Sequence, residues 1–400
     1  MASATATQRL SSISFSGAGF LGCYHMGAAA VLLKHGYLVG PGEFPPNDSS
    51  SSSPASLSAA DVPPPILTGV SAGSLVSIAV SAGVEPDTGM NVILEVAERT
   101  RKLGGALDIL RPGFSLVDQL HDLLLLNVRR ALGGTGETAT DYDRDLFLRR
   151  IEGGRLLRIG LTDKREFSPN GVVKDIPEAY RFVDRYRDVE DAVAASILSS
   201  YIPGITGTLK GAACPFNDAV KKSWERIFEM EQLGFIKDGK TGLPVSAGNG
   251  KQVGEGDHMP LPELHYWDGG LADIFPTIDD ETIIVSPING VYKNLSISPS
   301  LPGRLEEELA TKSQGPLTGE HKSANEDEGG LKVKFPASII PQTVQAHTRA
   351  QLGVNVENAE SLFRMMWSSD DAVLEERFRN GYDDANKFLS ERSMLRLFSR

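Results

Sequence analysis

The sequence predicts an α/β protein in which a mostly parallel central sheet carries helices on both faces. Three observations favour this class. Short apolar runs rich in β-forming residues alternate with segments of helical periodicity, and such alternation implies parallel pairing. The first two runs end in glycine-rich turns that lead directly into helical segments. The 400 residues, 40% of them hydrophobic and 23% charged, are enough for one large core or two smaller ones.

The first βα unit begins with a short strand at residues 13–15. It continues into the glycine loop Ser16-Gly17-Ala18-Gly19-Phe20-Leu21-Gly22, and a helical face then runs to Gly36. Because side chains are missing there, the backbone N–H groups of the loop can point at one spot, which suits an oxyanion or a phosphate. A nucleotide-binding fingerprint is the alternative. It fits poorly, because a proline- and serine-rich segment stands where an acidic residue is required about 20 residues later.

The second βα unit contains Ser71. Apolar residues from Pro65 to Thr68 predict a strand, Gly69-Val70-Ser71-Ala72-Gly73 predicts a sharp turn, and the small residues that follow predict a helix. Such a turn strains its central residue and crowds strand against helix, so only glycine fits on either side. The strain lifts the serine hydroxyl clear of the sheet, and the helix N-terminus favours negative charge there. Since a Gly-x-Ser-x-Gly motif alone is weak evidence, its context has to decide.

Apolar spacing predicts the remaining elements. The leucine-rich pattern at residues 114–128 indicates an amphipathic helix whose apolar face belongs to the core rather than to a membrane. The other predicted elements are helices at 91–103 and 189–199, strands at 156–162, 171–174 and 282–285, and a glycine-rich polar loop at 239–256.

The chain is predicted to have three parts. Residues 1–300 form a catalytic domain, interrupted by an aperiodic insertion at residues 41–65. Residues 301–330 are a charged, flexible linker, and residues 331–400 are a helical C-terminal extension. The last stretch, residues 387–400, mixes apolar and basic side chains. It fits packing against the core, which we favour, or contact with a lipid interface.

Composition limits the classes of binding partner and the cellular compartments that fit this chain. The formal net charge of −12 argues against nucleic acid and against unaided adsorption to anionic membranes. Two cysteines, Cys23 and Cys214, are too few for a disulfide framework or a four-cysteine zinc site, so a reducing compartment is expected. We find no signal peptide and no apolar run of about 18 residues that could span a bilayer. A cytoplasmic protein is therefore predicted, and if its substrate is a lipid, the protein must reach it from the aqueous side.

A nucleophilic serine needs a group that accepts its proton. Five histidines follow Ser71 and could complete a Ser-His-acid triad: His121, His258, His265, His321 and His347. Asp268 differs from them, because Tyr266-Trp267-Asp268-Gly269-Gly270 places one carboxylate on a tight turn with room for another backbone to approach. The alternative is that Asp-Gly-Gly is merely a common turn.

Three motifs in fixed order resemble the signatures of the patatin-like phospholipase family: Ser16 to Tyr24, Gly69 to Gly73, and Asp268 to Gly270. The Gly-Phe-Leu-Gly-x-Tyr-x-x-Gly form of the first motif is similar to the adipose triglyceride lipase branch. Further similarities extend the resemblance over about residues 13–389: Ser196 with Ile202-Pro203, Ser361 to Met365, and Gly381 to Leu389.

The resemblance implies a patatin-like three-layer α/β sandwich with a Ser-Asp dyad, and it implies no cofactor or metal. Ser71 would be the nucleophile, Asp268 the base, and the amides of Gly17, Ala18 and Gly19 the oxyanion hole. The motif glycines are Gly22, Gly69, Gly73, Gly269 and Gly270. Since the reference pKa of Asp is about 3.9, we expect a dry pocket, closed by Trp267, to raise the pKa of Asp268 toward neutrality.

These observations predict a serine acyl-ester hydrolase that acts on neutral glycerolipid, such as triacylglycerol, at a lipid droplet or membrane surface. Leu21 stands where the general patatin-like motif carries Arg or Lys, which fits a neutral glyceride better than an anionic phospholipid. The alternatives are a phospholipase A or lysophospholipase, a glyceride transacylase and, in another class, a lipid-binding regulator without catalysis. The sequence does not indicate whether a protein activator is required.

Overall fold

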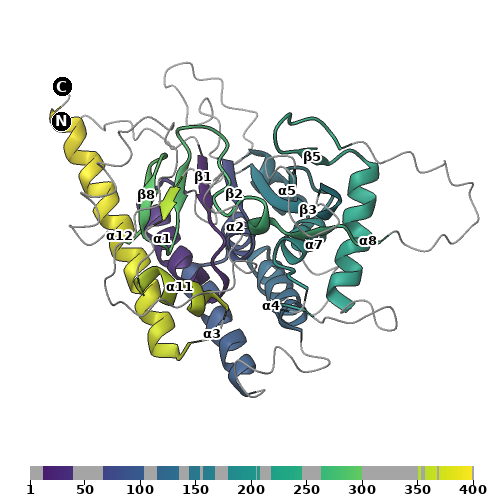
Figure 1. Cartoon of the computed structure of the whole chain (residues 1–400), viewed down its shortest axis with the longest axis horizontal. Coiled ribbons are helices and arrows are strands. Elements are labelled where there is room, and N and C mark those ends of the chain that lie inside the picture. The colour runs from purple at the N-terminus through teal and green to yellow at the C-terminus, as the bar shows by residue number, and fades with distance from the viewer. Residues whose placement is uncertain are drawn as a thin grey trace, which may run out of the picture.

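The computed structural model consists of one main sheet with helices packed around it (Figure 1). It describes residues 12–38, 66–102, 115–134, 144–153, 156–166, 179–203, 205–207, 218–245, 263–299, 350–352, 356–366 and 369–398. Three predicted segments lie outside these residues: the insertion at 41–65, the strand at 171–174 and the linker at 301–330.

The central sheet has the strand order β5-β4-β3-β2-β1-β7-β9, and β6 pairs with β3 off this path. The strands are β1 (Ser12–Phe15), β2 (Ile66–Gly69), β3 (Leu157–Asp163), β4 (Tyr180–Val183), β5 (Ile236–Asp238), β6 (Tyr266–Asp268), β7 (Ile283–Val285) and β9 (Ser296–Ile297). Pairing is parallel from β3 through β9, so the predicted mostly parallel sheet is confirmed. The sequence did not predict that β4, β5 and β6 pair in antiparallel fashion. A separate ribbon joins β8 (Gly290–Tyr292) to β10 (Ala350–Leu352).

The helices surround this sheet. They are α1 (Gly22–Lys34), α2 (Ala72–Ala82), α3 (Pro86–Lys102), α4 (Leu116–Ala131), α5 (Arg144–Gly153), α7 (Val189–Ser199), α8 (Asp218–Gln232), α11 (Val356–Met366) and α12 (Asp371–Phe398). Helix α7 has the bounds that the sequence predicted. Helix α3 begins five residues before the predicted start, because proline suits the first helical turn and Pro86 occupies it.

The largest apolar core lies between β3 and helices α2, α4, α5, α7 and α8. The predicted apolar face of α4 contributes Val117, Leu124 and Val128 to it, so the assignment of this face to the core is confirmed. Ser115 caps the start of α4 by accepting a hydrogen bond from the Asp118 amide. A second core lies between β1, β7 and helices α1 and α12.

Helix α12, yellow in Figure 1, runs beside the purple helix α1. The two backbones approach at a pair of glycines. A Cβ atom at Gly27 would collide with the carbonyl of Phe378, and a Cβ atom at Gly381 would collide with the carbonyl of Tyr24. Beside this crossing the Tyr24 hydroxyl donates to the Asp384 carboxylate at 2.7 Å. The C-terminal helix therefore closes the core over the first βα unit.

The beginning of the predicted amphipathic tail takes part in this packing. Leu389 is buried in the core between α1 and α12, and Phe388 packs against it. The side chains beyond Arg392 lie outside the described residues. Among the described helices, we find none with the length and apolar character needed to cross a membrane.

Replacing Gly381 with alanine should destabilise the protein, although alanine is the better helix former by about 1 kcal/mol. The new methyl group has no room beside the α1 backbone, and overpacking costs about 1–3 kcal/mol. Urea unfolding measures the change, with Asp383→Ala at an exposed position of α12 as the control. Equal or greater stability of Gly381→Ala would show that α12 does not pack this closely on α1.

Candidate active site

Ser71 lies at the turn between β2 and α2. Its φ of 52° and ψ of −133° make it the one non-glycine residue with positive φ among the described residues. A Cβ atom at Gly69 would collide with the backbone of Gly73, and a Cβ atom at Gly73 would collide with the carbonyl of Phe15. The predicted need for glycine on both sides of the serine is therefore confirmed. Ser71 is half-buried, so the strained turn presents its side chain to the surroundings.

Asp268 reaches this turn because β2 and β6 follow one another along the same edge of β3. Gly69 of β2 pairs with Ile159, and Asp268 of β6 pairs with Leu161, two residues further on. The opposite edge of β3 is taken by β4 at both positions. Two residues of a strand span about 7 Å. Strand β6 thus continues the sheet where β2 turns away into α2, and it brings Asp268 beside the Ser71 turn.

The backbone around Asp268 is held by hydrogen bonds. Its N–H donates to the Tyr201 carbonyl at 3.0 Å, and its carbonyl accepts from the Thr162 hydroxyl at 2.6 Å. Of the carboxylate oxygens, Oδ1 accepts from the Gly270 N–H at 2.8 Å, while Oδ2 has no hydrogen-bond partner within the part of the chain that the structure describes. Because the side chain is only 3% exposed, the free oxygen is withheld from bulk water. A buried carboxylate oxygen without a donor is suited to accept a proton.

Burial raises the pKa of Asp268 from 3.8 to about 7, and the Ser71 side chain and the Gly270 amide lower it by smaller amounts. The Ser71 hydroxyl therefore lies close enough to interact with this carboxyl group. The predicted rise in pKa is confirmed, but the predicted part of Trp267 is wrong. Successive side chains of a strand point to opposite faces, so Trp267 points away from the Asp268 side of β6, toward Lys164.

The glycine loop lies against the same turn. A Cβ atom at Gly17 would lie 3.8 Å from the Ser71 Cβ and 3.2 Å from Ile274. The Gly17 N–H, however, donates to the Ile274 carbonyl at 3.1 Å. This corrects the predicted oxyanion hole, because a donor that is already used in the fold cannot also bind an oxyanion. Ala18 and Gly19 stay as candidate donors.

The other motif residues position these backbones. Gly22 is the first residue of α1. A Cβ atom at Gly22 would lie 3.6 Å from the Ala72 Cβ, which is an ordinary van der Waals contact. A Cβ atom at Gly269 would collide with the Gly160 carbonyl, and Gly270 donates to Asp268 as described. Leu21 is fully buried and packs with Ala18, so this position of the loop holds a buried apolar side chain and no cation.

Of the five histidines that follow Ser71, the two that the structure describes bond elsewhere. His121 on α4 contacts Asp122, with 3.0 Å between Nδ1 and Oδ1. His265 contacts Glu231 at 3.2 Å and the Glu263 carbonyl at 3.1 Å. His258, His321 and His347 lie outside the described residues. Among the residues that the structure describes, no group of three His, Cys, Asp or Glu side chains could hold a metal ion.

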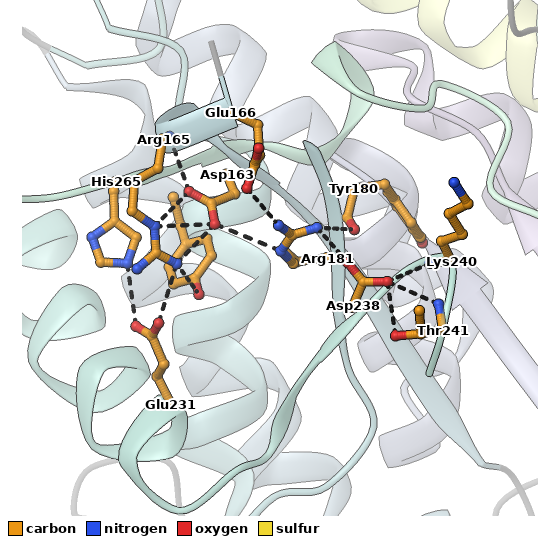
Figure 2. Close-up of polar contacts among 11 residues, drawn as sticks. Asp163, Arg165, Glu166, Tyr180, Arg181, Glu231, Asp238, Lys240, Thr241 and His265 are labelled. Carbon is orange, nitrogen blue, oxygen red and sulfur yellow. Dashed lines mark hydrogen bonds and ion pairs between the residues drawn. The ribbon is translucent and has the colours of Figure 1, made fainter. Parts of the chain in front are cut away.

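His265 belongs to an ion network at the end of β3, which Figure 2 shows. Asp163 is 1% exposed and forms ion pairs with Arg165 at 2.8 Å and Arg181 at 3.6 Å. Arg165 also bonds Glu231 at 3.1 Å. Asp163 is the β3 partner of Tyr266, two residues before Asp268. Paired and hydrogen-bonded in this way, the charges clamp the start of β6 instead of serving as a proton acceptor for Ser71.

Sequence reasoning missed two residues of this site. The Ile274 carbonyl accepts a hydrogen bond from the Gly17 N–H. The hydroxyl of Ser199, in the predicted small-residue helix, accepts one from the Ser71 N–H at 2.9 Å. Neither stands in one of the three motifs. The only signal in the sequence was the run of small residues in α7, which allows this helix to lie close to β3 and α2.

Comparison with protein-family models gives one match: the Patatin model, described as patatin-like phospholipase, matches residues 13–279 of the 400-residue chain. Neither the curated proteins nor the solved structures include a match to the chain. The matched residues include β1, the glycine loop, Ser71 and Asp268, whereas α11 and α12 lie beyond them.

The free energy of unfolding of Asp268→Asn should exceed that of the wild type increasingly from about pH 4 to about pH 7. In this window the unfolded chain releases the Asp268 proton while the folded protein retains it, because burial raises the pKa to about 7. The contribution of Asp268 to wild-type stability therefore falls as the pH rises, and the difference between the two proteins levels off above pH 7 at up to about 4 kcal/mol. Denaturant unfolding across pH, with Asp383→Asn as an exposed control, measures it. A pH-independent difference would contradict the raised pKa.

Proposed function

We propose that this chain, which belongs to the patatin-like phospholipase family, hydrolyses acyl esters of neutral glycerolipids through Ser71 and Asp268. Proteins of this family are lipid acyl hydrolases, so esterase chemistry is the starting point and the substrate is the open question. One observation carries the assignment of the dyad. A serine in a strained turn interacts with a buried carboxyl group whose pKa is raised to about 7 and whose Oδ2 has no hydrogen-bond partner among the described residues.

In the acylation step, Ser71 Oγ attacks the ester carbonyl carbon while its proton passes to Asp268 Oδ2. A base with a pKa near the working pH is well matched to this transfer, which an ordinary carboxylate is not. The carbonyl oxygen becomes an oxyanion, for which the N–H groups of Ala18 and Gly19 are the candidate donors. Asp268 then gives its proton to the leaving alcohol as the bond between the carbonyl carbon and that oxygen breaks.

Deacylation repeats these steps with water. Asp268, again ionised, takes a proton from a water molecule that attacks the acyl-serine carbonyl. The second tetrahedral intermediate collapses, Ser71 Oγ leaves and recovers the proton, and the fatty acid is released. An alcohol of a glyceride could replace the water, which would make the reaction a transacylation.

The proposal of a neutral substrate rests on the lining of the glycine loop. Leu21, Ala18 and Ala72 pack with Met365 into one apolar cluster next to Ser71. An anionic headgroup bound there would lose hydration without gaining a cation, whereas an uncharged glyceride would not. Phospholipid is the second candidate, which the name of the matched family favours. We propose that the protein acts at a lipid droplet or membrane surface, where such substrates are found.

Ser71→Ala and Asp268→Asn should each abolish ester hydrolysis in folded protein, because one removes the covalent route and the other the proton acceptor. His121→Ala and His265→Ala should keep catalytic turnover within a few fold. The measurement is release of p-nitrophenol from a short-chain ester, with circular dichroism to confirm folding. A histidine variant that is stable but inactive would contradict the Ser-Asp dyad and favour a catalytic triad that includes that histidine. Folded wild-type protein that turns over no ester and whose Ser71 is not labelled by a fluorophosphonate would indicate a lipid-binding regulator, because labelling requires an activated serine.

Purified protein should release fatty acid from triacylglycerol emulsions at least tenfold faster than from phosphatidylcholine vesicles or lysophosphatidylcholine micelles. The reason is the apolar cluster beside the glycine loop, which contains no cationic side chain to pair with a phosphate. Titration of released fatty acid measures all three substrates under one condition, with Ser71→Ala as the blank. Faster release from either phospholipid would assign the protein to the second candidate, and acyl transfer to added monoacylglycerol would identify a transacylase.

A further inference from the structure

A single hydroxyl joins the two halves of the candidate site. Ser199, the last residue of α7, is fully buried. Its Oγ accepts a hydrogen bond from the Ser71 N–H at 2.9 Å and donates one to the Gly160 carbonyl at 2.6 Å. Both distances are those of well-formed hydrogen bonds. The Ser71 backbone is therefore tied to β3 by a side chain from a third element.

The Gly160 carbonyl is also the point at which the Asp268 turn touches β3. Gly160 precedes Leu161, which pairs with Asp268. A Cβ atom at Gly269 would collide with the Gly160 carbonyl, so the two backbones are in close contact there. Ser199 thus bridges the backbone that carries the nucleophile and the strand that supports the base. Its two hydrogen bonds set the distance between them.

The Ser71 N–H requires such a partner. Positive φ at a residue with a side chain persists only where the surroundings hold it in place, and a buried N–H without an acceptor is costly. Ser199 provides the acceptor and thereby removes the Ser71 N–H from the set of donors that could bind an oxyanion. The candidate donors that remain are the Ala18 and Gly19 N–H groups of the glycine loop.

We propose that Ser199 is a positioning residue that holds the Ser71 hydroxyl in proton-transfer reach of Asp268. This inference rests on the proposed function, because it concerns the rate of the same reaction. It predicts an effect on the chemical step rather than on substrate binding, since Ser199 is fully buried beneath the turn. A displacement of 1 Å between reacting groups can cost about a hundredfold in rate.

The same helix offers a matched control. Ser196 lies one turn before Ser199 and is also fully buried, and its hydroxyl donates to the Ser74 carbonyl at 3.4 Å. That bond is long and reaches α2 beyond the turn, without touching Ser71, Gly160 or β6. Ser196→Ala therefore removes a buried hydroxyl of α7 and leaves the bridge intact.

The test compares Ser199→Ala, Ser199→Cys and Ser196→Ala in the full chain, with hydrolysis of a soluble p-nitrophenyl ester as the readout. Ser199→Ala should lower kcat between ten- and a hundredfold with KM within about twofold. Ser199→Cys has a side chain of similar size with a weaker donor, so its kcat should lie between that of Ser199→Ala and that of the wild type. Ser196→Ala should retain kcat. The apparent pKa of the rate profile should rise in Ser199→Ala, because the Ser71 hydroxyl that lowers the pKa of Asp268 moves away.

Equal kcat values for folded Ser199→Ala and Ser196→Ala would overturn the proposal, as would a loss confined to KM. If Ser199→Ala fails to fold, Ser199→Cys decides by the same comparison. A wild-type protein that hydrolyses no ester would refute the proposed function instead. In that case the rate of Ser71 labelling by a fluorophosphonate still tests the positioning, since slower labelling of Ser199→Ala than of Ser196→Ala supports it and equal labelling overturns it.

Discussion

The close approach of three backbones around Ser71 is the constraint on which the rest of the site depends. Gly69 and Gly73 touch each other across the turn, and Gly73 touches the end of β1 at Phe15. No side chain fits at these contacts, so the chain has to reverse at Ser71 in a conformation that L-residues rarely adopt. The strain is sustained because strand, helix and neighbouring strand all fix the same few atoms.

The sheet determines which carboxyl group lies beside this turn. Strand β2 ends at Gly69, and β6 occupies the vacated edge of β3 from the opposite direction. Strand β6 has only three residues, but it keeps its place beside β3 because the buried ion network of Asp163 and Arg165 holds β3 at the start of β6. The carboxyl group of Asp268 is thereby forced into a dry position, which opposes stability but raises its basicity.

Features encoded locally could be predicted from the sequence, and features that depend on distant segments could not. The turn at Ser71, the glycine loop and helix α7 follow from short patterns, because neighbouring residues decide them. The antiparallel direction of β6, the acceptor for the Gly17 N–H at Ile274 and the bond from Ser71 to Ser199 join residues far apart in the chain. Nothing in the spacing of the motifs specifies these pairings.

The site is also not contained within the residues that match the family model. Gly19 has a φ of 51° and lies so close to α11 that a Cβ atom there would collide with the Met365 carbonyl. Helix α11 is held by a pair of amide hydrogen bonds between Asn358 and Asn289, at 2.9 and 3.1 Å. Residues beyond position 279 therefore fix the backbone of a candidate oxyanion donor. Since the glycine loop packs against α11 on one side and Ser71 on the other, the C-terminal helix α11 helps to shape the candidate active site rather than forming a separate appendage.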